Sequence, residues 1–245
     1  MTGRATTARS IRVVAGEIDT RSVTTRLVLP TGGQPVWPPF VRVAESAASQ
    51  GRTLPAHAHE REEVLTFVTE GFAVYQLGHD APVALSQGAA RLLTTGVRTE
   101  HRVSPAHGGA IRWFNLVVGL PAADARAPRL QSAGADSPTI EVDTVRVRPL
   151  VGPRAPMTSG AGLECQELVF VNESTTIPRV GPRRRGVLYA LAGRGTVDDQ
   201  PLEAGEAALV EGVPGISVRG HVGFRAMFAT GPVEAVGSAA PAEHR

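Results

Sequence analysis

The chain has 245 residues, enough to bury one large or two ordinary hydrophobic cores, and a net charge of +2. Its 27 glycines and 19 prolines, with only 4% aromatic residues, favour many short strands joined by turns over long helices. No apolar run approaches the roughly 20 residues that span a bilayer, and no signal peptide is recognisable, so we expect a cytoplasmic protein without a membrane anchor. The charge is spread along the chain, which predicts no nucleic-acid binding.

Short strands follow one another through the first half. SIRVVAG (residues 10–16) predicts an edge strand. The stretch TLPAHAHEREEVLTFV (residues 53–68) predicts a strand that begins beside two histidines. The alternating segment GFAVYQLG follows it, and we expect these two segments to form a hairpin around Glu70 and Gly71. Further strands are expected at residues 26–30, 40–44, 83–88, 89–96 and 110–119.

Residues 122–140 are rich in Ala, Pro, Ser and Gly and show little periodicity, so they predict a linker. Strands recur beyond it, for example LECQELVFV and FRAMFAT. We therefore expect an N-terminal domain at 1–121, a C-terminal domain at 141–235 and a frayed tail at 236–245.

An internal repeat supports two copies of one β unit. TLPAHAHEREEVLTFV lines up with TIPRVGPRRRGVLYAL (residues 176–191), and VALSQGAARLL with QPLEAGEAALV. In this alignment His57, His59, Glu63 and His101 correspond to Val180, Pro182, Gly186 and a position near Val218. The polar set is therefore expected only in the first unit.

Three histidines of the first unit are candidate metal ligands. His57 and His59 share one face of an extended chain, and His101 follows about forty residues later near the end of another strand. In a small antiparallel barrel these strands can return beside each other, and three neutral imidazoles can then hold one ion with open positions for substrate. The competing interpretation is a polar rim of solvated histidines.

Glu63 is the candidate catalytic residue. Strict alternation places it on the face of His57 and His59, where it can act as a fourth ligand, orient an imidazole or accept a proton from substrate. A solvated carboxylate at the end of a strand is the competing interpretation. A β-bulge would exchange the positions of Glu62 and Glu63.

Four segments resemble the pirins, iron-binding proteins of the cupin superfamily. These segments are VWPPFVRVAE, PAHAHEREEVLTFVTEG, LLTTGVRTEHRV and RWFNLVVGLPAADARAPRLQ. The resemblance implies an all-β fold of two tandem cupin-type jelly-roll barrels, a bicupin, with the metal site in the N-terminal barrel only.

The resemblance also implies a ligand set. The three iron-binding histidines of the family fall on His57, His59 and His101, and its glutamate ligand falls on Val103. The implied cofactor is a divalent metal, Fe(II) first, with Ni, Mn or Zn as alternatives. Glu63 is the residue that could replace the missing carboxylate.

Some pirins are quercetin 2,3-dioxygenases, so the resemblance implies a dioxygenase acting on a flavonol or another enolisable small molecule in the N-terminal barrel. One alternative is a non-oxidative isomerase, cyclase or lyase of specialised metabolism that uses the same site. Another is a redox-sensing or transcription-modulating binding protein without catalysis.

Overall fold

A computed structural model describes residues 10–19, 23–31, 37–49, 51–106, 108–121, 127–142 and 144–233. Every regular element in these ranges is a β-strand, so the all-β prediction is confirmed. The same ranges contain no helix that could cross a bilayer. The predicted tail at 236–245 lies outside the described residues.

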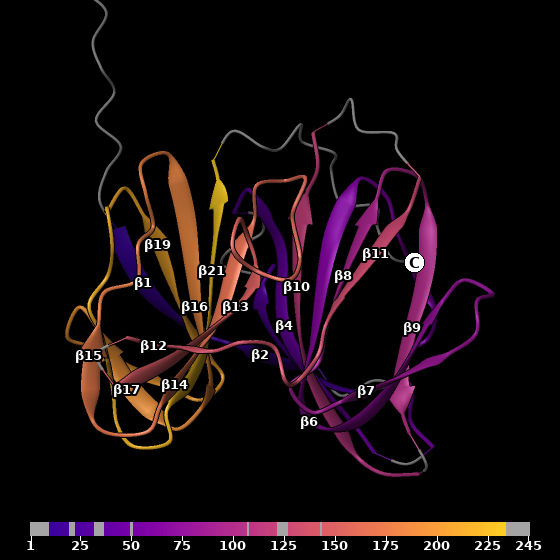
Figure 1. The fold of residues 1–245 in the computed structure, drawn as a ribbon, viewed down its shortest axis with the longest axis horizontal. Coiled ribbons are helices and arrows are strands. Elements are labelled where there is room, and N and C mark those ends of the chain that lie inside the picture. Colours follow the sequence, from indigo (N-terminus) through magenta and orange to yellow (C-terminus); the bar gives the residue numbers. More distant parts are fainter. Residues whose placement is uncertain are drawn as a thin grey trace, which may run out of the picture.

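The strands form two curled units that lie side by side (Figure 1). The first unit is a ten-stranded sheet in which β11, β8, β6, β10, β4, β3 and β2 are neighbours in that order, while β5, β7 and β9 pair around the second part of β6. Its strands are β2 (Glu17–Asp19), β3 (Thr24–Leu29), β4 (Phe40–Ala48), β5 (His57–His59), β6 (Glu62–Leu77), β7 (Val83–Ser86), β8 (Ala90–Thr95), β9 (Thr99–Pro105), β10 (Ile111–Gly119) and β11 (Arg129–Ala133).

The second unit combines a seven-stranded and a four-stranded sheet. The larger sheet contains, in order, β1 (Ser10–Ala15), β19 (Glu206–Glu211), β16 (Arg184–Ala192), β21 (Arg225–Pro232), β14 (Glu164–Phe170), β13 (Val145–Val151) and β12 (Ile140–Val142). The smaller sheet contains β15 (Ser174–Thr176), β20 (Val218–Gly220), β17 (Arg194–Val197) and β18 (Gln200–Glu203).

Two strands cross the domain boundaries expected from the sequence. The N-terminal strand β1 is an edge strand, as expected, but it pairs with β19 of the second unit and lies among its orange strands in Figure 1. Strand β11 falls in the expected linker, yet it pairs with β8 of the first unit. Each unit thus receives a strand from outside its expected range.

The expected hairpin around Glu70 and Gly71 is a single bent strand instead. Strand β6 runs without interruption; its first part pairs with β8 and β10, and its second part pairs with β7 and β9. Gly71 has a φ of 79° and lies so close to the Ala110 carbonyl oxygen that an added Cβ would be 2.3 Å from it. Glycine therefore lets the chain bend from one side of the barrel to the other without reversing.

The largest apolar core is shared by the two units. It contains Leu65 and Phe67 of β6 together with Val187 and Tyr189 of β16. The rings of Phe114 and Tyr189 meet across this interface with centroids 5.2 Å apart. A second core fills the second unit, and a third, which includes Tyr75, Val103 and Trp113, lies inside the first unit.

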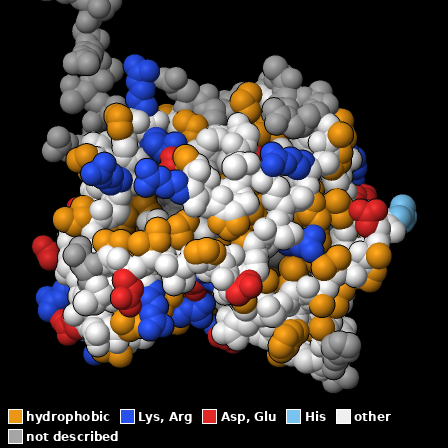
Figure 2. Space-filling model, viewed as in Figure 1, with side chains coloured by type: hydrophobic (Ala, Val, Ile, Leu, Met, Phe, Trp, Pro, Cys, Tyr) orange, Lys and Arg blue, Asp and Glu red, His pale blue; other side chains and the backbone are white. Residues whose placement is uncertain are grey.

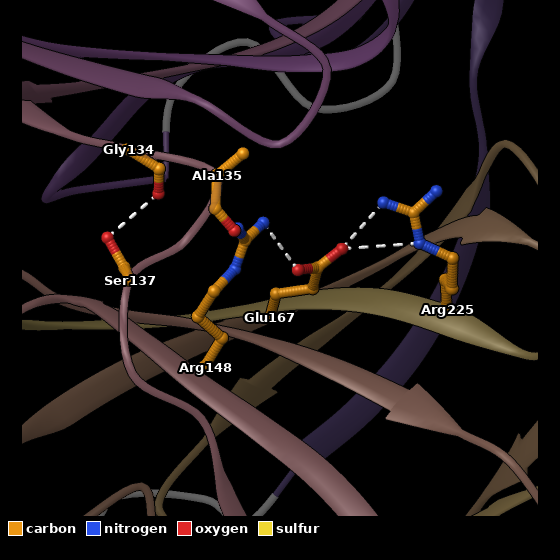
Figure 3. A network of polar contacts seen from close by, with 6 residues as sticks. All are labelled: Gly134, Ala135, Ser137, Arg148, Glu167 and Arg225. Carbon is orange, nitrogen blue, oxygen red and sulfur yellow. Dashed lines mark hydrogen bonds and ion pairs between the residues drawn. The ribbon is translucent and has the colours of Figure 1, made fainter.

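A buried ionic network lies near the same interface (Figure 3). The Glu167 carboxylate pairs with two arginines. Its Oε2 atom lies 2.7 Å from Arg148 Nη2, and its Oε1 atom lies 2.6 Å from Arg225 Nη2. The Arg148 guanidinium also lies over the Phe67 ring of the first unit, with Cζ 5.3 Å from the ring centroid. Its charge is therefore paired within the second unit while its planar face contacts the first.

Basic and acidic side chains are both scattered over the face drawn in Figure 2, across the two units.

Candidate metal centre

The structure brings His57, His59 and His101 together inside the mouth of the first barrel. Strands β5 and β9 pair antiparallel, with His57 directly opposite His101. The ring centroids lie 4.5 Å apart for His57 and His101, 5.0 Å for His57 and His59, and 5.1 Å for His59 and His101. One ligand atom from each residue lies within 4.8 Å of the other two, so these three side chains could hold a metal ion.

Hydrogen bonds set the tautomers of the two histidines on β5. The Nδ1 atom of His59 lies 2.6 Å from Glu62 Oε2, and the Nδ1 atom of His57 lies 3.1 Å from the Pro55 carbonyl oxygen. A proton on each Nδ1 satisfies these acceptors and places the lone pair on Nε2. A carboxylate or carbonyl behind a metal-binding imidazole is the usual way of orienting such a ligand.

His101 is the most buried of the three, with 2% of its surface exposed. Neither of its ring nitrogens has a hydrogen-bond partner among the described residues, and the same holds for His59 Nε2. Burial, reinforced by the nearby His57 and His59, lowers the pKa of His101 to about 2. Its imidazole is therefore neutral, as a metal ligand must be, and a bound ion would satisfy the buried nitrogens.

The expectation for Glu63 needs correction, because this residue does not share the histidine face. Residues 60 and 61 form a bend between β5 and β6, and Arg61 has a φ of 55°. This bend breaks the alternation, so that Glu62 lies on the histidine side and Glu63 on the opposite face with Leu65 and Phe67.

The Glu63 carboxylate reaches into the second unit. It is fully buried (0% exposed) and accepts hydrogen bonds from Thr94 Oγ1 at 3.0 Å, from the Gly160 amide at 2.8 Å and from the Ser159 hydroxyl. The Ser159 hydroxyl accepts in turn from the Leu163 amide at 2.8 Å. Through these contacts the Glu63 carboxylate links the first unit to the loop before β14 of the second.

The bend before the strand also shifts the alignment of the internal repeat by one residue. Arg183, just before β16, has the same φ of 55° as Arg61 just before β6. Aligned on these bends, the counterpart of Glu63 is Arg185 and not Gly186. Arg185 also reaches across the interface, where its Nη1 donates to the Pro38 carbonyl oxygen at 2.7 Å.

The second barrel has apolar side chains where the first has imidazoles. Val180 and Val218, aligned with His57 and with the region of His101, are both buried in the core of the second unit. Among the described residues of the second unit, no group of histidine, cysteine or acidic side chains could hold a metal. The ligand set therefore belongs to the first unit.

Val103, where the sequence resemblance implied a glutamate ligand, lies two residues after His101 on β9. It is buried in the core of the first unit and pairs with Tyr75 on β6. Because residues two apart on a strand share a face, Val103 points into the barrel below His101. The candidate ligand set is therefore composed of neutral imidazoles alone.

Two polar side chains of the barrel interior were not singled out in the sequence. The Tyr75 ring lies 5.3 Å from the His101 ring, and its hydroxyl is buried without a partner among the described residues. The Arg91 Cζ atom lies 5.7 Å from the centroid of the Tyr75 ring. Burial raises the pKa of Tyr75, with Arg91 opposing the shift. The only sequence signal for Tyr75 is the alternation of GFAVYQLG, which puts this residue on the same face of the strand as Ala73 and Leu77.

The other described histidines lie apart from the centre. His79 and His221 are exposed, and His221 Nδ1 lies 3.8 Å from Glu173 Oε2 in the second unit. His107 lies outside the described residues.

Comparisons with known proteins support the fold. Neither a scan against family models nor a search of curated proteins gives a match. Among solved structures, GK1651 from Geobacillus kaustophilus matches with a TM-score of 0.83 and 24% identity over 94% of this chain and 99% of that one. A quercetin 2,3-dioxygenase from Acinetobacter baumannii matches with a TM-score of 0.80 and 18% identity over 91% and 80%. The bacterial pirin YhhW from Escherichia coli, in complex with nickel(II), matches with a TM-score of 0.76 and 13% identity over 91% and 99%.

At these identities the likeness concerns the fold, and the fold is that of a pirin-like bicupin. The architecture implied by the four sequence segments is thus confirmed.

Proposed function

We propose that the first barrel holds one divalent metal ion on His57, His59 and His101, and that this centre binds and activates a small molecule through its oxygen atoms. The observation that carries the proposal is the convergence of three imidazoles whose ligand atoms lie within 4.8 Å of one another. Three histidine ligands leave further coordination positions open for substrate, as catalytic metal sites require.

Fe(II) is the metal we propose first. Imidazole ligands suit iron, nickel and zinc, and the solved relative YhhW is a nickel complex. Since Val103 supplies no charge, the ion would keep its two positive charges and would attract anionic oxygen donors.

The proposed reaction is a quercetinase-like dioxygenation of a flavonol or another enolisable small molecule. When bound, a redox-active metal supplies Lewis acidity and access to dioxygen chemistry. Glu62 holds the ring of His59 through the 2.6 Å bond and is the carboxylate nearest the candidate ligands, so it takes over the proton-accepting role expected for Glu63. The interior of the barrel, lined by Tyr75 and Val103, would exclude water from the bound molecule.

A non-oxidative isomerase or lyase is the second candidate, and Val103 is the observation that favours it. Without a carboxylate among the ligands the centre is more electrophilic, which suits polarisation of a carbonyl or enediol. The two candidates share the metal and the substrate class and differ in the consumption of oxygen.

The proposal is tested by reconstituting purified protein with Fe(II), Ni(II), Mn(II) or Zn(II), measuring bound metal and following oxygen uptake with quercetin. We expect about one metal per chain, its loss in His57→Ala, and its retention in His79→Ala, which changes an exposed histidine as a matched control. Turnover of substrate without oxygen uptake would rule out the dioxygenase and support the non-oxidative isomerase or lyase. Failure of the wild-type protein to retain any of these metals would contradict it.

A further inference from the structure

We propose that Arg91 and Tyr75 form an anion-binding subsite inside the first barrel, and that the molecule bound there carries a carboxylate in addition to its metal-binding oxygens. This inference rests on the proposed function, because it concerns the second end of a molecule held at the three histidines.

Arg91 lies in a polar row that crosses the inner face of the sheet. In the strand register Arg91 of β8 is opposite Thr66 of β6, and Thr66 is opposite Asn115 of β10. The residues that alternate with this row on the outer face, such as Leu65 and Phe114, belong to the core between the two units. The row therefore faces the interior of the barrel.

Among the residues that the structure describes, Arg91 has no counter-ion. Over the described ranges no acidic side chain lies within ion-pair distance of it, and its Nε atom is buried without a hydrogen-bond acceptor. Along the row, the Oδ1 atom of Asn115 already accepts from Thr66 Oγ1 at 3.2 Å. Arg91 is half-buried and its Nε still lacks an acceptor, and a carboxylate matches the planar set of guanidinium donors best.

Tyr75 connects Arg91 to the metal centre. The centroid of its ring lies 5.7 Å from the Arg91 Cζ atom and 5.3 Å from the centroid of the His101 ring. Tyr75 is 2% exposed, and its hydroxyl, a hydrogen-bond donor, has no partner among the described residues. Two unsatisfied donors beside three candidate ligands indicate a molecule with an acidic group that reaches beyond the metal.

The charge balance favours the same conclusion. A divalent ion held by neutral histidines keeps two positive charges, because the described ligand cluster contains no carboxylate. Arg91 adds a third, and the Glu62 carboxylate, bonded to His59, offsets part of this charge. In the low-dielectric interior of a barrel such an excess draws in anionic ligands.

A matched pair of ligands tests the subsite: catechol, which offers only metal-binding oxygens, and 3,4-dihydroxybenzoate, which adds a carboxylate at the far end. Affinities are measured on the full chain loaded with cobalt(II), through the visible absorption of the ion and by calorimetry. We expect the carboxylate to tighten binding by about tenfold or more, equivalent to ~1.4 kcal/mol.

Three variants locate the effect. Arg91→Gln is expected to abolish the preference for the carboxylate while catechol binds as before, and Tyr75→Phe, which keeps the ring, is expected to reduce the preference in part. Arg102→Gln removes the same charge from an exposed residue of β9 and is expected to keep the full preference. Thermal unfolding of each loaded variant shows whether it is folded, and Tyr75→Phe carries the test should Arg91→Gln not fold.

Equal affinity for the two ligands in the wild-type protein, or an undiminished preference in Arg91→Gln and Tyr75→Phe, would overturn the subsite and leave the metal centre standing. Loaded protein that binds neither ligand would overturn it as well. Absence of a cobalt spectrum in the wild-type protein is the distinct result that would overturn the proposed function itself.

Discussion

Replacing Glu63 by alanine is predicted to weaken the junction between the two units and to leave metal binding intact. The wild-type carboxylate is fully buried and accepts from Thr94, from the Gly160 amide and from Ser159. The substitution leaves these three donors facing an apolar methyl group and a small cavity.

The magnitude follows from the donors that lose their acceptor. Each buried donor left unsatisfied costs about 1–3 kcal/mol. The relief of an ionised carboxylate from burial offsets part of this loss. We therefore expect Glu63→Ala to lower the free energy of unfolding by about 3 kcal/mol, a large share of the 5–15 kcal/mol of an ordinary domain. Glu63→Gln, which keeps one acceptor oxygen, should cost less.

The assay is urea unfolding of metal-free protein, combined with calorimetric titration of the folded variants with a divalent metal. Glu60→Ala changes an exposed carboxylate in the same bend and is the matched control, expected to leave stability unchanged. The assignment of Glu63 to the junction would be refuted by a variant that keeps wild-type stability and loses metal affinity.

The other predictions concern charges near the two sites. Val103→Glu places a carboxylate on the inner face beside His101. It should raise the divalent-metal affinity measured by calorimetry by about tenfold and lower the melting temperature of the metal-free protein. The control Arg102→Glu, on the outer face, should change neither. Glu62→Gln should weaken metal binding by about 10–100-fold, because the bond that orients His59 loses its charge; unchanged affinity would contradict this. Burial raises the pKa of Glu45, which accepts from Tyr189, so its folded-state pKa exceeds the unfolded one and ionisation destabilises the fold. Glu45→Gln should therefore unfold at higher denaturant than wild type at neutral pH, and the difference should vanish once the pH falls below the ordinary glutamate pKa of about 4.3; a difference that persists in acid would refute it.

Sequence patterns were sufficient where one local rule decides the outcome. Two histidines one residue apart on a strand must share a face, and the return of the chain at His101 follows from antiparallel pairing, so the three imidazoles could be predicted. The bicupin fold was likewise predictable from four motifs in order.

The assignment of Glu62 and Glu63 failed because one backbone angle decides it. Arg61 adopts a positive φ that few non-glycine residues take, and no residue type in HEREE marks it. A shift of one residue moves every later side chain of a strand to the other face. The sequence therefore contained both candidates and no means of choosing between them.

Long-range pairing accounts for the remaining differences. Nothing within SIRVVAG shows that β1 pairs with β19, nearly two hundred residues later, because the partner of an edge strand is set by tertiary packing. The short strand β11 was hidden in a segment of linker-like composition. Tyr75 and Arg91 come from strands β6 and β8, and only the fold shows that they meet, with the Tyr75 hydroxyl and Arg91 Nε lacking hydrogen-bond partners among the described residues.

The central claim is that three imidazoles hold one metal ion, and X-ray absorption at the metal edge of reconstituted protein measures this directly. We predict about one ion per chain, surrounded by three imidazole nitrogens near 2.0–2.1 Å if the ion is zinc, and loss of that signal in His101→Ala. A spectrum with no imidazole scattering, or one unchanged by His101→Ala, would contradict the account.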